Sequence, residues 1–186
     1  MIMLKSFLPD LIDVNQYETF NEFIEELFYI LYNQFFVEKI RFNGKFVKIN
    51  KTPLKCTQND NCNSVEYSCN HCPFQGKYER FNHIVTGLNE NTRTPGKYKE
   101  SRAIRVHWIK YIIENVQSEK ILYFKKGTKH YFWAKYVSYI VIIKETPKGD
   151  YYLITAFYID DKTYEFKFEK DYLIYNNLFK NEKDSP

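Results

Sequence analysis

The chain has 186 residues, with 27 Lys and Arg against 23 Asp and Glu, and 44% of its residues are hydrophobic. This apolar content is enough to fill a core, which excludes a chain that is disordered throughout. The longest strongly apolar run, residues 137–143, is far shorter than the ~20 residues that a membrane-spanning helix needs. The N-terminus lacks the pattern of a secretory signal. We therefore expect a soluble, cytoplasmic protein without a membrane partner.

The net charge of +4 conceals two regions of opposite sign. Residues 1–40 carry seven acidic and two basic side chains, whereas residues 77–135 carry 13 basic and five acidic ones. A basic segment is typical of a protein with a polyanionic partner, most often a nucleic acid. The alternative interpretation is a surface of solvated lysines.

The N-terminal 50 residues predict one helix and one hairpin. Apolar side chains in residues 15–33 recur with helical spacing, and Asn15 with Glu18 fits a capping box. The outer face of this helix is acidic, so the helix either packs on a sheet or docks a partner protein. Two β-rich runs, residues 37–42 and 45–49, flank Asn43-Gly44, a pair that is typical of a type I′ turn.

Residues 51–73 form a polar insert that holds all four cysteines. Cys56, Cys62, Cys69 and Cys72 have the spacing C-x5-C-x6-C-x2-C. A C-x2-C pair supplies two thiolates from one turn, so we expect a structural zinc ion held by the four cysteines. His71 is an alternative ligand. Two disulfides and unliganded thiols are the other interpretations.

The remainder of the chain, residues 74–186, predicts a second α+β region. His83 lies in a short β-like segment that ends at Gly87, and residues 100–117 have helical periodicity. Strand-like runs follow at residues 131–145, 151–159 and 163–168. The predicted fold is α+β, with a helix packed on an antiparallel sheet. Its three parts, residues 1–50, 51–73 and 74–186, are expected to form one compact unit.

The basic region contains each group that RNA cleavage without a metal ion requires. Such cleavage uses a base for the 2′-hydroxyl proton, an acid for the leaving 5′-oxygen and cations for the phosphorane. On a continuous helix, Arg105 falls on the apolar face with Arg102 near its edge. This indicates an anion pocket, a structural ion pair with an acid such as Glu79 or Glu100, or a helix that starts only after Arg105. His107 and Lys110 project to the other side. Thr155, in a late strand, is a further candidate donor to phosphate.

Three of these segments together resemble a known superfamily. They are the histidine before Gly87, the R-x2-R-x2-W step at Arg102, Arg105 and Trp108, and the run LITAF at residues 153–157. Over residues 74–175 the chain resembles the barnase–EndoU–colicin–RelE superfamily, most closely its phage-borne and mobile-element-borne nucleases. The resemblance implies an α+β domain that cleaves RNA to a 2′,3′-cyclic phosphate without a metal ion, often as a toxin.

The resemblance also implies roles for individual residues. His83 matches the catalytic histidine, Arg102 or Arg105 matches the phosphate-stabilising cation, and Thr155 matches the late-strand hydroxyl. Tyr158 matches a base-stacking residue. The general acid is open between His107 and Lys110. The expected catalytic residues are His83, Arg102, Arg105 and Thr155, and the expected substrate-binding residues are Arg80, His107, Trp108, Lys110 and Tyr158.

We therefore expect an endoribonuclease, of a toxin or antiphage type, that carries a structural zinc ion. Two alternatives belong to other classes of protein. The first is a zinc-containing protein that binds nucleic acid without cleaving it. The second is a protein-interaction module whose acidic N-terminal helix binds an antitoxin or another partner.

Overall fold

The computed structural model describes residues 7–54, 73–87 and 98–183, with side chains up to residue 177. The chain divides into two compact units. The helical unit comprises Met1–Lys39 and Asn50–Tyr111, and the sheet unit comprises Ile40–Ile49 and Ile112–Pro186. Each unit is described by itself. Among the helices of the described residues, none is long and apolar enough to cross a membrane.

The first long helix of the helical unit is α1 (Phe20–Tyr32), which follows the short helix η1 (Val14–Gln16) and continues into the π-helical turn η2 (Asn33–Val37). Its buried side chains are Phe23, Ile24, Leu27 and Leu31. This confirms the amphipathic pattern, but the predicted helix start was wrong. The capping box is formed by Thr19 and Glu22, four residues after the predicted pair, because a β-region residue precedes the first helical turn there.

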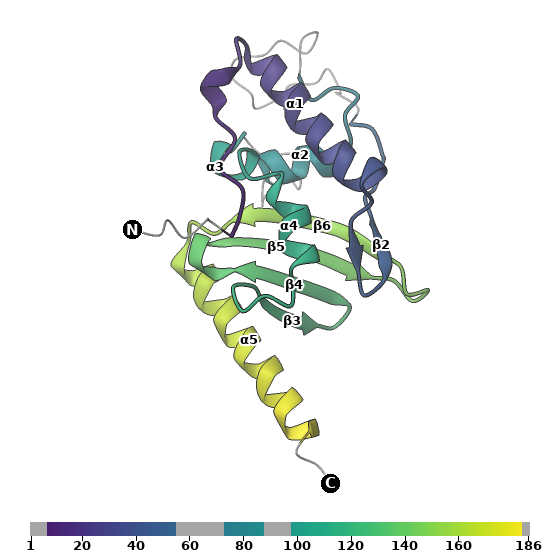
Figure 1. Ribbon diagram of the computed structural model, residues 1–186, viewed down its shortest axis with the longest axis vertical. Helices are drawn as coiled ribbons and strands as arrows, with labels where there is room; N and C mark the ends of the chain where they lie inside the picture. Colours follow the sequence, from purple (N-terminus) through teal and green to yellow (C-terminus); the bar gives the residue numbers. More distant parts are fainter. Residues whose placement is uncertain (1–6, 55–72, 88–97, 184–186) are drawn as a thin grey trace. The chain divides into compact units, whose positions relative to one another are not determined.

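Three shorter helices follow: α2 (Glu79–Thr86), α3 (Glu100–Ala103) and α4 (Trp108–Glu114) (Figure 1). Because His83 lies within α2, the predicted β-like segment was wrong. The predicted helix over residues 100–117 is interrupted between α3 and α4. There the backbone changes to tighter i→i−3 hydrogen bonds, such as that from the Val106 amide to the Ala103 carbonyl (3.1 Å). Such a turn rotates the following side chains away from a continuous helical face.

The sheet unit contains six strands in the order β1-β2-β6-β5-β4-β3. β1 (Arg41–Phe42) and β2 (Lys45–Lys48) form the predicted hairpin, but its first strand is shorter than predicted because Val37 ends the π-helical turn η2. Asn43 (φ 48°) and Gly44 (φ 75°) both have the positive φ that the type I′ turn requires. β2 pairs in parallel with β6 (Tyr151–Tyr158), whereas the other pairings are antiparallel.

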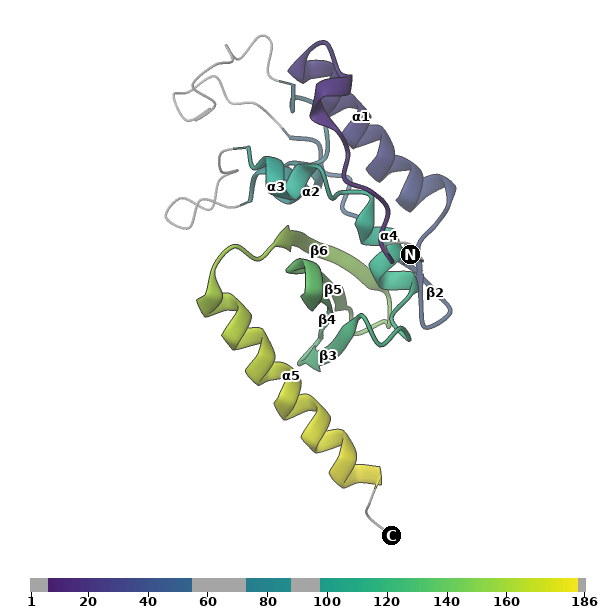
Figure 2. The ribbon, with the colours of Figure 1, turned by 60° about the vertical axis from the view of Figure 1, so that its left-hand side comes forward.

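The remaining strands are β3 (Leu122–Lys126), β4 (Lys129–Ala134) and β5 (Tyr139–Glu145). Helix α5 (Lys162–Lys183) packs on this sheet, as Figure 2 shows. The predicted strand over residues 163–168 was therefore wrong. The core beneath α5 is built from Phe124, Trp133, Ile140, Ile142, Ile159 and Phe168. The predicted α+β class, with a helix packed on the sheet, is confirmed.

Candidate functional site

Three basic side chains of the helical unit lie close together, and we call them the α2–α3 cluster: Arg80 and His83 from α2, and Arg102 from α3. A backbone hydrogen bond from Lys99 to the carbonyl of Val85 (3.0 Å) joins the segment before α3 to α2. Arg102 then donates from Nη1 to the carbonyl oxygen of His83 (3.1 Å). Residues that are 19 positions apart in sequence are thereby held side by side.

The end of α2 explains why this approach is possible. The carbonyl of His83 also accepts the amide of Gly87 (2.9 Å), so a guanidinium and a C-terminal cap meet at one helix end. A cation is favourable there because the helix dipole leaves the last carbonyls partly negative. Gly87 has φ 83° and ψ −173°, a combination that is essentially restricted to glycine.

The electrostatics of the cluster centre on His83. Burial lowers the pKa of its imidazole to about 4, and the charges of Arg80 and Arg102 contribute, while a hydrogen bond to the backbone of Gly87 opposes them. Burial also lowers the pKa of Arg80. The Nδ1 atom of His83 is buried and has no hydrogen-bond partner among the described residues. At neutral pH His83 is therefore an uncharged imidazole between two cationic groups.

Such an arrangement favours an anion. A phosphate group beside the two guanidinium groups would offset the positive potential that lowers the His83 pKa. The imidazole would then become a stronger base while remaining neutral before the reaction. A neutral imidazole next to a bound phosphate is the group that a general-base step at a ribose hydroxyl requires.

The other site residues that we predicted in the helical unit are held by contacts with nearby residues of the same unit. Arg105 donates from Nη1 to the Ser101 carbonyl (2.6 Å), and its guanidinium lies 5.3 Å from the Trp108 ring centroid. The Trp108 indole donates to the Pro9 carbonyl (2.9 Å), and His107 Nε2 lies 2.8 Å from the Asp10 carbonyl. Lys110 forms an ion pair with Glu38 (3.4 Å). These contacts anchor the α3–α4 turn within the unit.

Thr155 and Tyr158 lie on β6, in the sheet unit. Thr155 is 8% exposed, and its hydroxyl has no hydrogen-bond partner among the described residues. The strict alternation of side chains that we predicted for this strand is interrupted. Ile142 pairs with Thr155 while Ile143 pairs with Leu153, so a β-bulge inserts one extra residue in β6.

The four cysteines and His71, which we predicted to bind zinc, lie outside the described residues. Within residues 7–54, 73–87 and 98–183, no group of three or more His, Cys, Asp or Glu side chains is placed to hold a metal ion.

A second histidine network, in the sheet unit, was not predicted. His130 on β4 is 3% exposed, whereas its position after a lysine-rich turn indicated a solvated loop. Its Nδ1 lies 2.7 Å from the Tyr123 hydroxyl and its Nε2 lies 3.3 Å from a carboxylate oxygen of Glu145. The alternation of His130 with the buried Phe132 was the available sequence signal, because both side chains point to one face of β4.

Comparison of the chain with protein-family models, with curated proteins and with solved structures gives no match.

Proposed function

We propose that the protein is an endoribonuclease that needs no catalytic metal ion, and that the α2–α3 cluster binds the scissile phosphate. The observation that carries the proposal is the contact between Arg102 and the His83 carbonyl (3.1 Å), with the Arg80 charge also acting on the His83 imidazole. The basic charge of residues 77–135 supports the approach of a polyanion. The resemblance to barnase–EndoU–colicin–RelE nucleases, with His83 and Arg102 at matching positions, agrees with this choice.

The reaction follows from the chemistry of these groups. The His83 imidazole accepts the proton of a ribose 2′-hydroxyl, and the 2′-oxygen attacks the adjacent phosphorus. The bond from phosphorus to the 5′-oxygen breaks, the 5′-oxygen takes a proton from solvent, and a 2′,3′-cyclic phosphate remains. Arg80 and Arg102 stabilise the additional negative charge on the phosphorane oxygens.

Three further assignments belong to this proposal. Cys56, Cys62, Cys69 and Cys72 hold a structural zinc ion. The acidic outer face of α1 binds an antitoxin or another partner protein. The protein acts in the cytoplasm, as a toxin or antiphage effector, where cysteine thiols stay reduced and available to zinc.

RNA cleavage in excess EDTA tests the nuclease proposal directly. We expect a 2′,3′-cyclic product somewhere between about pH 5 and pH 8, with loss of cleavage in His83→Ala and Arg102→Ala. The matched controls are His130→Gln and Arg41→Ala, which alter the same residue types in the sheet unit. Zinc content and the melting curve of each sample are measured in parallel. Absence of cleavage at every pH, or full activity of folded His83→Ala, would overturn the proposal.

A non-enzymatic nucleic-acid binder is the second candidate. The observation that favours it concerns the general acid. His107 is the other described histidine of the helical unit, and its ring contacts the Asp10 carbonyl instead of serving as an acid in the α2–α3 cluster. Binding without cleavage would then weaken in Arg102→Ala and fall steeply with salt. The EDTA experiment separates the two candidates, because only the nuclease forms a product.

A further inference from the structure

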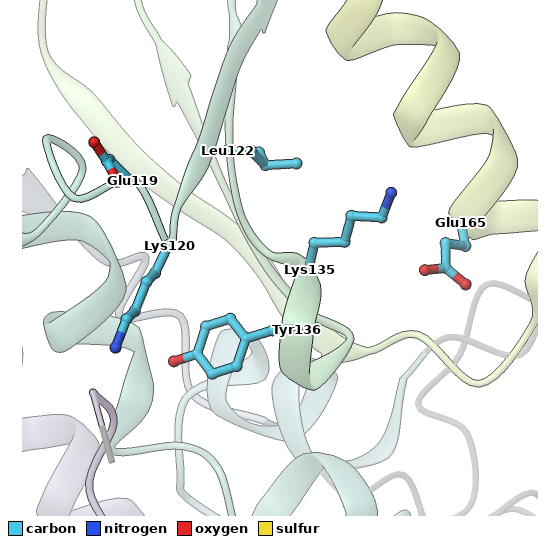
Figure 3. A pocket seen from close by; sticks show the side chains of 6 residues that line it. All are labelled: Glu119, Lys120, Leu122, Lys135, Tyr136 and Glu165. Carbon is cyan, nitrogen blue, oxygen red and sulfur yellow. The ribbon is translucent and has the colours of Figure 1, made fainter. Parts of the chain in front are cut away.

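A pocket of about 670 Å³ lies in the sheet unit, and none of the residues that line it belongs to the α2–α3 cluster. Figure 3 shows its lining: Glu119, Lys120, Leu122, Lys135, Tyr136 and Glu165. These residues come from the segment before β3, from β3 itself, from the short helix η4 (Lys135–Val137) and from the start of α5. The volume falls within the range of small-molecule sites, about 300–1,000 Å³.

The aromatic wall of this pocket is exposed and firmly held. Tyr136 is 52% exposed, although it is a large side chain in a short turn. The turn ends at Ser138, which has φ 51° and donates its amide to the Lys135 carbonyl (3.0 Å). The Ser138 carbonyl in turn accepts the amide of Ile159 (2.6 Å). An aromatic ring presented on such an anchored turn is a platform on which a planar base can stack.

Charged groups flank the ring on two sides. In Figure 3, Lys120 lies on the side of the Tyr136 hydroxyl, whereas Lys135 and Glu165 lie on the α5 side, and Glu119 points away from Tyr136. Lys135 also forms an ion pair with Glu169 (2.7 Å), and Glu165 is the carboxylate that lines the pocket on that side. Burial raises the pKa of the Tyr136 hydroxyl, so the hydroxyl stays protonated and can donate.

The combination of groups selects one class of ligand. A nucleotide carries a planar base, which suits Tyr136, and a phosphate, which suits Lys120 and the Tyr136 hydroxyl. A carboxylate accepts a hydrogen bond from an exocyclic amino group such as N4 of cytosine, whereas uracil presents a carbonyl oxygen at the same position and repels the carboxylate.

We propose that this pocket binds one nucleotide of a single-stranded nucleic acid and prefers an amino-bearing base to uracil. Tyr136 stacks on the base, Glu165 accepts the amino group, and Lys120 binds the phosphate. The inference stands apart from cleavage at the α2–α3 cluster, since the pocket belongs to the sheet unit alone.

Titration of the full-length protein with 5′-CMP, 5′-UMP and inorganic phosphate tests the pocket. The Arg102→Ala background is used so that phosphate binding at the α2–α3 cluster does not contribute. We expect CMP to bind more tightly than UMP and than phosphate. Tyr136→Ala should weaken CMP binding about tenfold or more, and the control Tyr29→Ala, an exposed tyrosine of α1, should leave it unchanged.

The proposed role of the Glu165 carboxylate in choosing the base is tested by replacing the carboxylate with an amide. Glu165→Gln retains the size of the side chain but adds an amide donor, so the preference for CMP over UMP should narrow or reverse. CMP that binds no more tightly than phosphate, or unchanged CMP binding in folded Tyr136→Ala, would overturn the proposal. Loss of RNA cleavage in Arg102→Ala with CMP binding retained separates this site from the proposed nuclease site.

Discussion

A β-carbon at Gly87 would lie 2.7 Å from Nη1 of Arg102. Two separate effects therefore act against a side chain at this position. The positive φ of the residue disfavours any β-carbon, and an added β-carbon would push the flexible Arg102 guanidinium out of the place where it contacts the His83 carbonyl.

Gly87→Ala should lower the free energy of unfolding by about 1–3 kcal/mol through backbone strain alone, and the displaced guanidinium should add to this loss. Urea unfolding gives the measurement. Gly127→Ala is the comparison for the contact with Arg102, because Gly127 also has positive φ (58°) but has no atom within 4 Å of the added carbon. Its φ is one that non-glycine residues of this protein also adopt, so its strain should be the smaller of the two. Phosphate or RNA binding should weaken in Gly87→Ala only. Equal stability losses with equal binding in the two variants would show that Arg102 is not displaced.

The His83 imidazole should titrate near pH 4 in the free protein. Burial and the two neighbouring guanidinium groups both disfavour its charged form. Arg102→Ala removes one of the two charges, so the pKa should rise toward the ordinary value of about 6.5. Added inorganic phosphate should raise it in the wild-type protein as well. NMR titration of the ring protons measures these pKa values. A His83 pKa that is unchanged both in Arg102→Ala and by added phosphate would show that the arginine charges do not act on His83.

The lowered pKa of His83 also makes the free energy of unfolding depend on pH. The unfolded chain binds a proton at His83 below about pH 6.5, whereas the folded chain binds it only near pH 4. The contribution of His83 is therefore fully present above about pH 6.5 and is lost as the pH falls toward 4. Between pH 7 and pH 5, about the working range of histidine, His83→Gln should lose less stability than the wild-type protein does. Parallel losses would contradict the buried, neutral imidazole.

Sequence patterns predicted those helices and strands that are determined by residues close together in the sequence. The Asn43-Gly44 turn fixed the β1–β2 hairpin, and the apolar spacing of Phe23, Ile24 and Leu27 fixed the buried face of α1. The start of α5 contains both a strand pattern and a helix pattern. Its aromatic and polar residues alternate as in a strand. Tyr164, Phe168, Tyr172 and Tyr175 also recur with helical spacing. The Asp161 carboxylate accepts the Thr163 amide (2.7 Å), and burial of Phe168 beneath the helix decides in favour of α5.

The candidate site was predictable only in part. Composition indicated a basic region, and His83 and Arg102 were both selected from it. Their approach depends on the backbone hydrogen bond between Lys99 and Val85, which joins two segments that are distant in sequence, and no local pattern encodes such a bond. Thr155, which was selected with them, belongs to the sheet unit.

Metal analysis tests the predicted zinc site. We expect one zinc ion per chain by elemental analysis of the purified protein, since four thiolates complete a tetrahedral site. Cys69→Ser and Cys72→Ser should each lower the zinc content and the melting temperature, because metal binding is coupled to folding. Ser118→Ala, a change in the sheet unit, is the control. Protein that is folded and free of zinc in reducing buffer would contradict the site.

An ion pair of Lys77 with Glu25 couples α1 to the segment before α2. The lysine side chain is 8% exposed, whereas that of the glutamate is 67% exposed, so the lysine carries most of the desolvation. Glu25→Ala leaves a buried ammonium without this acceptor and should cost about 1–3 kcal/mol of unfolding free energy. Lys77→Met removes the buried charge and should be nearly neutral. Glu18→Ala, at an exposed position, should change stability by less than about 0.5 kcal/mol. A larger loss in Lys77→Met than in Glu25→Ala would contradict this account.

The proton positions in the sheet-unit network follow from its partners. Nε2 of His130 faces the Glu145 carboxylate and therefore carries the proton, which leaves Nδ1 to accept from the Tyr123 hydroxyl (2.7 Å). Burial, together with Tyr175, Tyr151 and Glu145, raises the Tyr123 pKa, so this hydroxyl remains a donor.

Tyr123→Phe should therefore leave Nδ1 of His130 buried without its donor and lower the free energy of unfolding by about 1–3 kcal/mol. Tyr131→Phe is the matched control, a partly buried tyrosine of the adjacent strand whose ring stacks on Phe124 (4.6 Å between centroids). Its loss should stay below about 0.5 kcal/mol. The ring packing of both tyrosines survives the change, so urea unfolding of the two variants isolates the hydrogen bonds of the Tyr123 hydroxyl with His130 and Tyr175. Equal losses would show that the Tyr123 hydroxyl contributes no more than an ordinary surface group, and that packing and the Glu145 contact hold His130 in the sheet.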